Sequence, residues 1–91
     1  MEYEALPGGE LIRQGIEDLG RAKESVPALL VLIGAPRLRR IGLPIPESSL
    51  IGAERRLYEL LAEENPDSAH SRYNALVRTL VSFERAAECA G

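Results

Sequence analysis

The chain has 91 residues and a formal net charge of −3 at pH 7, with 45% hydrophobic and 27% charged residues. This length allows one domain, residues 1–91, with a modest core, and the hydrophobic share argues against a disordered chain. The acidic balance argues against general affinity for nucleic acids, because binding phosphates needs a basic surface. Three tyrosines, one phenylalanine and no tryptophan predict an aliphatic core.

A single cysteine, Cys89, excludes an intramolecular disulfide and any zinc site built from cysteines. The first ten residues lack the basic start and apolar core of a signal peptide. The longest apolar run, residues 26–35, is about half of the ~20 residues that a membrane span requires. We therefore expect a cytoplasmic protein with no membrane association.

Residues 1–9 are expected to form an extended lead-in that ends in the Pro-Gly-Gly sequence at 7–9. Residues 10–23 then show an amphipathic helical pattern, with Ile12, Ile16 and Leu19 on one side. Gly15 and Gly20 weaken this helix, and either they permit close packing against the next helix or they merely shorten it.

Residues 25–35 are the most apolar stretch and predict a central helix that is buried on every side. Ser25 can cap its first free amides, and Pro27 falls in the first turn, where its missing N–H costs nothing. A strand is excluded because the chain has no second β-branched run to pair with. Pro36 predicts a kink or break, after which residues 35–40 leave the core.

Residues 42–47, with two prolines, predict an extended connector with Leu43 and Ile45 tucked against the core. Ser48 or Ser49 is expected to cap a third helix reaching Glu64. Its predicted buried stripe consists of Ala53, Leu57, Leu60 and Leu61.

Asn-Pro at 65–66 ends that helix, and Asp67 or Ser68 can cap a long last helix at about residues 67–89. Its apolar positions repeat with a helical period: Ala69, Tyr73, Leu76, Val77, Leu80, Phe83 and Ala87. The sequence thus predicts an all-α fold, a small compact bundle of four to five helices around the 25–35 helix.

Groups for catalysis or metal binding are scarce. His70 is the single histidine, and no second ligand stands at a metal-binding spacing from it. Glycine-rich phosphate loops and nucleophile elbows are also missing from the sequence. We therefore expect no enzyme activity, no metal and no cofactor.

Two groups of polar residues are candidate contacts with a partner or a nucleic acid. Arg72, Asn74 and Arg78 lie on the last helix, and the two last helices with their turn have roughly the spacing of a helix-turn-helix. The second group consists of Arg37, Arg39 and Arg40. These arginines could contact a phosphate backbone, or they could interact favourably with the negative end of a helix dipole and pair with acidic residues of the third helix.

Glu84 departs from the pattern of the last helix, because it falls inside the apolar arc. It is expected to pair within the chain with an arginine such as Arg55 or Arg56, or else to meet a positive charge on a partner chain.

The leading functional hypothesis is a small protein-interaction or regulatory module. We expect it to self-associate as a homodimer through its long helices, or else to bind another protein. It rests on the expectation that so short a chain leaves apolar surface uncovered around the central helix. A DNA-binding protein of helix-turn-helix type is the less favoured alternative.

Overall fold

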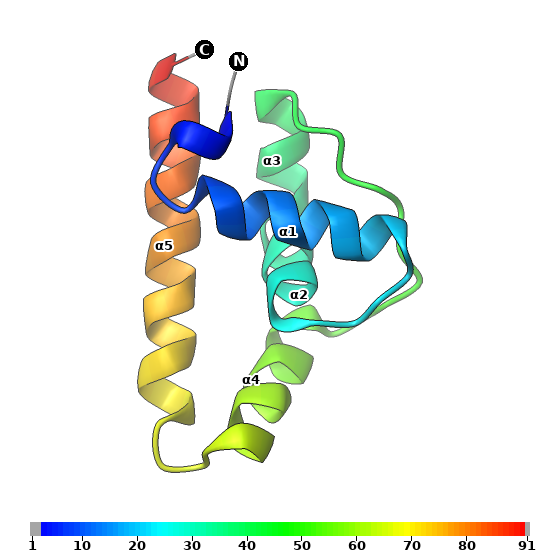
Figure 1. Ribbon diagram of the computed structural model, residues 1–91, viewed down its shortest axis with the longest axis vertical. Helices are drawn as coiled ribbons and strands as arrows, with labels where there is room; N and C mark the ends of the chain where they lie inside the picture. The colour runs from blue at the N-terminus through cyan, green and yellow to red at the C-terminus, as the bar shows by residue number, and fades with distance from the viewer. Residues whose placement is uncertain (1–2, 91) are drawn as a thin grey trace.

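The computed structural model describes residues 3–90, which form five α-helices and one short 3-10 helix and contain no strand. Their order is η1 (Tyr3–Ala5), α1 (Gly9–Gly20), α2 (Val26–Ile33), α3 (Ala35–Ile41), α4 (Ala53–Glu64) and α5 (Ala69–Ala90). The helix α5 runs the length of the molecule on one side, with α1, α2 and α3 beside its C-terminal half and α4 beside its N-terminal half (Figure 1). The expected all-α bundle is confirmed.

The central helix α2 begins as its sequence predicts. Ala28 N donates to Ser25 Oγ over 3.1 Å, and Pro27 lies in the first turn. The four residues Ala28 to Val31 are at most 1% exposed, because α1 and α4 pack against this helix and α5 also contacts it. The expected shortage of cover around the central helix is therefore not found: one chain buries the middle of α2 by itself.

Gly34 separates α2 from α3, and Pro36 stands at the start of α3, where a helix has no need of its N–H. The predicted break is confirmed. The expectation that residues 35–40 leave the core is wrong, because Leu38 is fully buried and Ala35 is 4% exposed. Gly34 allows this packing: a Cβ there would lie 2.9 Å from both Leu80 Cδ1 and Glu84 Oε2 on α5.

The connector after α3 holds Leu43 and Ile45 in the core, as expected, with 5% and 8% exposed. The predicted start of the next helix is wrong. The helix α4 begins at Ala53 after Gly52, whose φ of 66° is in the left-handed region. Ser48 Oγ instead accepts a hydrogen bond from Leu50 N within the connector, so the two prolines and this local turn keep the chain extended for longer than expected.

The lead-in also differs from its prediction, because residues 3–5 form the 3-10 helix η1. The ring of Tyr3 stands edge-on to Phe83 of α5, with centroids 6.2 Å apart. This contact between an aromatic edge and an aromatic face favours a folded lead-in over an extended one. The part of the expectation that concerns Met1 and Glu2 lies outside the described residues.

A buried carboxylate fixes the turn between α1 and α2. Asp18, 3% exposed, accepts hydrogen bonds from Ser25 Oγ (2.6 Å) and from Gln14 Nε2 (3.0 Å). The bond from Ser25 lowers the pKa of Asp18 against the opposing effect of burial. Ser25 thus has two structural roles: its Oγ accepts a hydrogen bond that caps α2, and its hydroxyl donates one to Asp18 of α1.

Close packing of α1 on α2 depends on Gly15. A Cβ at this position would collide with the carbonyl oxygen of Pro27 and with the side chain of Val31. Gly20, at the end of α1, has no atom within 4 Å of such a Cβ. The role in close packing suggested for both glycines thus applies to Gly15 alone.

These two glycines give a matched pair of variants. We expect Gly15→Ala to lower the free energy of unfolding by about 1–3 kcal/mol, because the backbone of α2 must move away. Gly20→Ala should raise it by up to about 1 kcal/mol, since alanine restricts the unfolded chain and suits a helix better. Urea denaturation followed by circular dichroism measures both. Equal effects of the two changes would contradict the packing role of Gly15.

Candidate functional site

A cluster of three charged side chains joins α3 to α5. Arg37 forms a two-pronged contact with Glu88, with Nη2 to Oε1 at 2.6 Å and Nε to Oε2 at 2.9 Å. Its Nη1 also donates to Glu84 Oε1 over 3.3 Å. One guanidinium therefore spans two carboxylates on successive turns of α5 and holds α3 against that helix.

Glu84 is 4% exposed, and burial raises its pKa, with the neighbouring Glu88 adding to the rise while Arg37 opposes it. The hydrogen bond from Arg37 has the opposite effect on Glu88 and lowers its pKa. The two carboxylates thus differ in environment although one arginine serves both.

The expectation that Glu84 pairs within the chain is confirmed, but the expected partners are wrong. Arg55 contacts Glu59 within α4, and Arg56 contacts Glu24 and Glu59. The reason lies in the arrangement of the helices, since α4 packs beside the N-terminal half of α5 while Glu84 lies in the other half, beside α3 (Figure 1).

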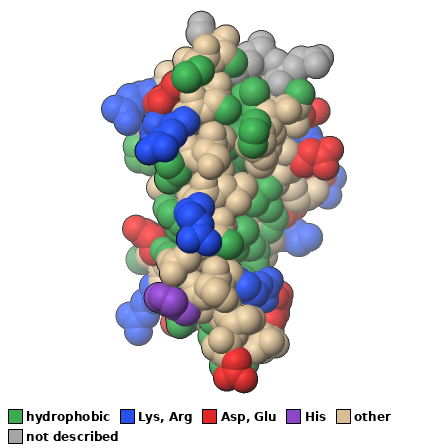
Figure 2. All heavy atoms as spheres, turned by 90° about the vertical axis from the view of Figure 1, so that its left-hand side faces the viewer, with side chains coloured by type: hydrophobic (Ala, Val, Ile, Leu, Met, Phe, Trp, Pro, Cys, Tyr) green, Lys and Arg blue, Asp and Glu red, His purple; other side chains and the backbone are tan. Residues whose placement is uncertain are grey.

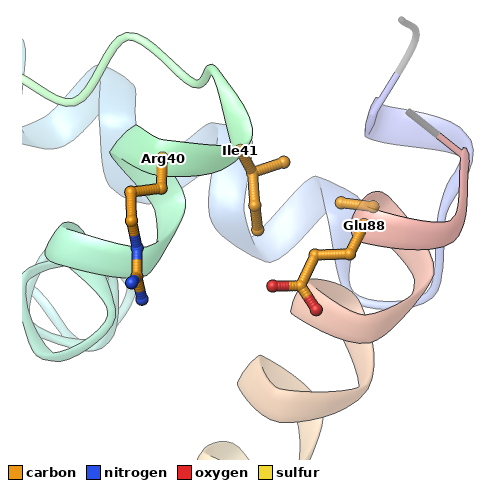
Figure 3. Close-up of a pocket in the computed structure, with 4 residues that line it drawn as sticks. Arg40, Ile41 and Glu88 are labelled. Carbon is orange, nitrogen blue, oxygen red and sulfur yellow. The ribbon is translucent and has the colours of Figure 1, made fainter.

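An open cleft of about 530 Å³ adjoins this cluster, lined by Arg40 and Ile41 of α3 and by Ala87 and Glu88 of α5. Figure 3 shows the carboxylate of Glu88 directed from α5 toward α3, across the cleft from Arg40. Arg40 makes no ion pair within the described part of the chain. Because Glu88 is already held by Arg37, Arg40 is the cleft's one charged group without such a partner among residues 3–90.

The six predicted contact residues do not form one surface. Arg37 is engaged by two carboxylates, and Arg39 donates to the carbonyl oxygens of Ile45 and Pro46 and so holds the connector. The suggested pairing of this arginine group with acidic residues of the third helix is wrong for Arg37, which reaches α5 instead.

On α5, Arg72 forms an ion pair of 2.7 Å with Glu64 across the turn from α4. Asn74 lies 3.2 Å from the ring of His70. Arg78 is exposed and makes no ion pair within residues 3–90. Figure 2 faces α5 and shows isolated basic groups separated by apolar and neutral surface, with acidic groups at the margins. A continuous basic stripe is not visible on this face.

No group of three histidine, cysteine or acidic residues among residues 3–90 is arranged to hold a metal ion. Every buried side-chain nitrogen and oxygen in this described range has a hydrogen-bond partner. A search of the same residues finds no helix that is both long enough and apolar enough to span a membrane. The predictions of no enzyme activity, no metal and no cofactor stay predictions.

The large hydrophobic side chains left exposed in the described chain are Ile51, 90% exposed, and Tyr58, 40% exposed. Ile51 precedes the N-cap of α4, and Tyr58 lies on α4 with its ring 5.9 Å from that of Tyr73. Neither residue is among the contact residues predicted from the sequence. The position of Tyr58 around α4 could have predicted its exposure, because Tyr58 lies about 100° around the helix from the buried Leu57 and so outside the buried stripe.

We use the name α4 edge for Arg55, Tyr58 and Ala62 of α4 together with Ile51, which directly precedes the N-cap of that helix. Arg55, Tyr58 and Ala62 are spaced three and four residues apart, which places them on one side of α4. The side chain of Arg55 is 88% exposed, and Ala62 is half-buried. This surface combines an exposed aliphatic group, an aromatic ring and a cation.

Comparison with known proteins assigns no relative: no protein-family model matches the chain, and no curated protein or solved structure matches it significantly.

The two carboxylates bound by Arg37 should respond differently to neutralisation. Because the pKa of Glu84 is raised on folding, its charge destabilises the fold once the pH exceeds that pKa. We expect Glu84→Gln to match the original protein at low pH and to be equal or up to about 1 kcal/mol more stable at pH 7.

Glu88→Gln is the matched control. Since Arg37 lowers the pKa of Glu88, the charged form contributes stability that is lost as the pH falls. This variant should therefore be the less stable one at pH 7 and approach the original protein in acid. Thermal unfolding between pH 3 and 8 tests both variants. If their melting temperatures depended on pH in the same way, the different environments assigned to Glu84 and Glu88 would be wrong.

Proposed function

We propose that this protein is a small helical protein-interaction module that self-associates through the α4 edge. The observation that carries this proposal is the exposure of Ile51 and Tyr58, the large hydrophobic side chains that the described chain leaves exposed although its core is covered. Ile51 directly precedes the N-cap of α4 and Tyr58 lies on that helix, so both exposed side chains belong to one segment of the chain. Exposed apolar groups in excess of scattered single residues are typical of contact surfaces. Tyrosine also suits such a surface because it combines a large apolar ring with a hydroxyl group.

Pairing through the apolar stripe of the long helix has less support than the α4 edge. Leu80, Phe83 and Ala87 are at most 3% exposed, so the chain already uses that part of the stripe. The opposite side of α5 exposes Arg78 and Arg85, and two such helices would bring like charges together. The interaction is therefore assigned to α4 instead of α5.

The helix-turn-helix alternative remains the less favoured proposal. Arg72 pairs with Glu64 and Arg37 with Glu88, so DNA would have to compete with carboxylates already in place. Glu63 and Glu64 are exposed at the end of α4, where they would repel phosphates.

Light scattering over a range of protein concentrations tests self-association. The molar mass should rise toward twice that of the chain, and Ile51→Ser should shift the rise to higher concentration by several-fold, because the exposed side chain loses its apolar contact. Arg78→Ala, on the exposed side of α5, is the control and should leave the mass curve unchanged. A monomer at every concentration would contradict the proposal.

The same control variant serves the alternative. Salt-sensitive binding of duplex DNA that Arg78→Ala abolishes would favour the helix-turn-helix protein over the interaction module.

A further inference from the structure

We infer that the cleft between α3 and α5 is a binding site for a small carboxylic acid with a short aliphatic chain, whose carboxylate pairs with Arg40. The cleft has a volume of about 530 Å³, which is within the usual range of small-molecule sites. It lies beside the C-terminal half of α5, whereas α4 packs beside the N-terminal half (Figure 1). The site is therefore separate from the α4 edge and goes beyond the proposed self-association.

Arg40 is a cation that the folded chain leaves unused. Its side chain is exposed and makes no hydrogen bond or ion pair with another side chain among residues 3–90. The two neighbouring arginines differ from it, because Arg37 binds two carboxylates and Arg39 binds carbonyl oxygens of the connector. Of the three arginines of α3, the one that lines the cleft is the one that stays available for a ligand.

The C-terminal end of α3 does not need Arg40 as a cap. Gly42 N donates to Arg39 O over 3.0 Å, and Leu43 N donates to Leu38 O over 3.1 Å. The φ of Gly42, 108°, is in the left-handed region that favours this backbone closure of a helix. These carbonyl oxygens thus already have backbone donors, and the guanidinium of Arg40 has no structural task at the helix end.

The charges around the cleft favour an anion, although the whole chain has a net charge of −3. Glu88 on the opposite wall is already bound by Arg37, with N to O distances of 2.6 and 2.9 Å. The pKa of Glu88 is lowered by this hydrogen bond and further by the positive charges of Arg40 and Arg85. Three arginines thus act on two carboxylates, Glu84 and Glu88, which leaves a local excess of one positive charge. A ligand with a single negative charge would balance that excess.

Ile41 supplies the apolar contact of the site. This residue is half-buried, and Figure 3 shows its side chain between those of Arg40 and Glu88. A guanidinium binds a carboxylate well because two of its N–H groups can donate in parallel. An aliphatic acid can therefore place its carboxylate at Arg40 and its chain against Ile41, whereas a small polar anion uses the first contact alone.

The two walls of the cleft hold their positions without a ligand. Arg37 joins α3 to α5 through Glu84 and Glu88, and Leu38 and Ala87 behind the cleft are fully buried. Binding between two helices that are already packed costs little ordering of the chain. Because the cleft is open and offers one free charged group, we expect a dissociation constant on the order of 1 mM.

Titration with hexanoate, followed by NMR spectra of the backbone amides, tests the site. The amide signals of residues 37–42 and 84–89 should shift and reach saturation at millimolar hexanoate. Acetate has the same carboxylate without the longer chain and should bind several-fold more weakly. Hexylammonium has the chain with the opposite charge and should leave these signals unchanged.

Three variants assign the two contacts. Arg40→Gln should weaken hexanoate binding by about tenfold, because the charged hydrogen bonds are lost. Arg78→Gln is the matched control: it removes another exposed arginine that makes no ion pair within residues 3–90, and it should keep the original affinity. Ile41→Ser should lower the affinity for hexanoate to that for acetate. Circular dichroism should show the same helical content for all three variants.

The controls decide between binding at this cleft and weaker alternatives. The assignment is wrong if Arg40→Gln and Arg78→Gln weaken binding equally, or if hexanoate shifts none of the expected signals. Hexylammonium binding as tightly as hexanoate would show that the cleft recognises a cation through Glu88. Equal affinities for acetate and hexanoate would overturn the aliphatic part of the assignment. All of these results are independent of whether the protein forms a dimer through the α4 edge.

Discussion

The fold depends on one constraint: the helix Val26–Ile33 has no polar face, and a chain of 91 residues must cover it. Full burial of each of its large side chains contributes about 1.5–3 kcal/mol, which is a large share of the stability of so small a domain. The other helices are arranged to supply this cover. The approach of α1 requires Gly15, and the hydrogen bond from Ser25 to Asp18 fixes the turn that joins α1 to the central helix.

The break at Gly34 has electrostatic consequences for α5. Because α3 turns back onto α5 instead of leaving the core, Leu38 is buried and Arg37 reaches the carboxylates of the long helix. Glu84 then lies where an unpaired charge would be costly, and Arg37 is the group that reduces this cost. The interaction with Glu88 orients Arg37 by two short hydrogen bonds, so Glu84 benefits from an arginine that is held mainly by its neighbour.

Local patterns in the sequence predicted the helices because each was strong. Ser25, Pro27 and the apolar run after them define α2, and the period of the apolar residues defines α5. The start of α4 could not be predicted in the same way, because Ser48 and Gly52 both suit the position before a helix and only the packing of the connector decides between them.

The partner of Glu84 was harder still to predict from the sequence. The apolar arc showed that this carboxylate needs a cation, but the choice between Arg37 and Arg56 depends on which helix lies beside the C-terminal half of α5. That choice is set by the return of α3, which Gly34 permits through its lack of a side chain against Leu80. Long-range pairing thus follows from packing and not from spacing along the chain.

Closure of the core changes the reason for expecting a partner. If α2 had been left partly bare, association would have been needed for folding, and the interface would have been large and apolar. With Leu29, Leu30 and Val31 at most 1% exposed, the folded chain does not depend on a second molecule. The contact proposed at the α4 edge would then form and break freely, because the helices of each copy would keep their own core in both states. Such an association responds to concentration without unfolding the protein, which is the property that a reversible interaction module requires.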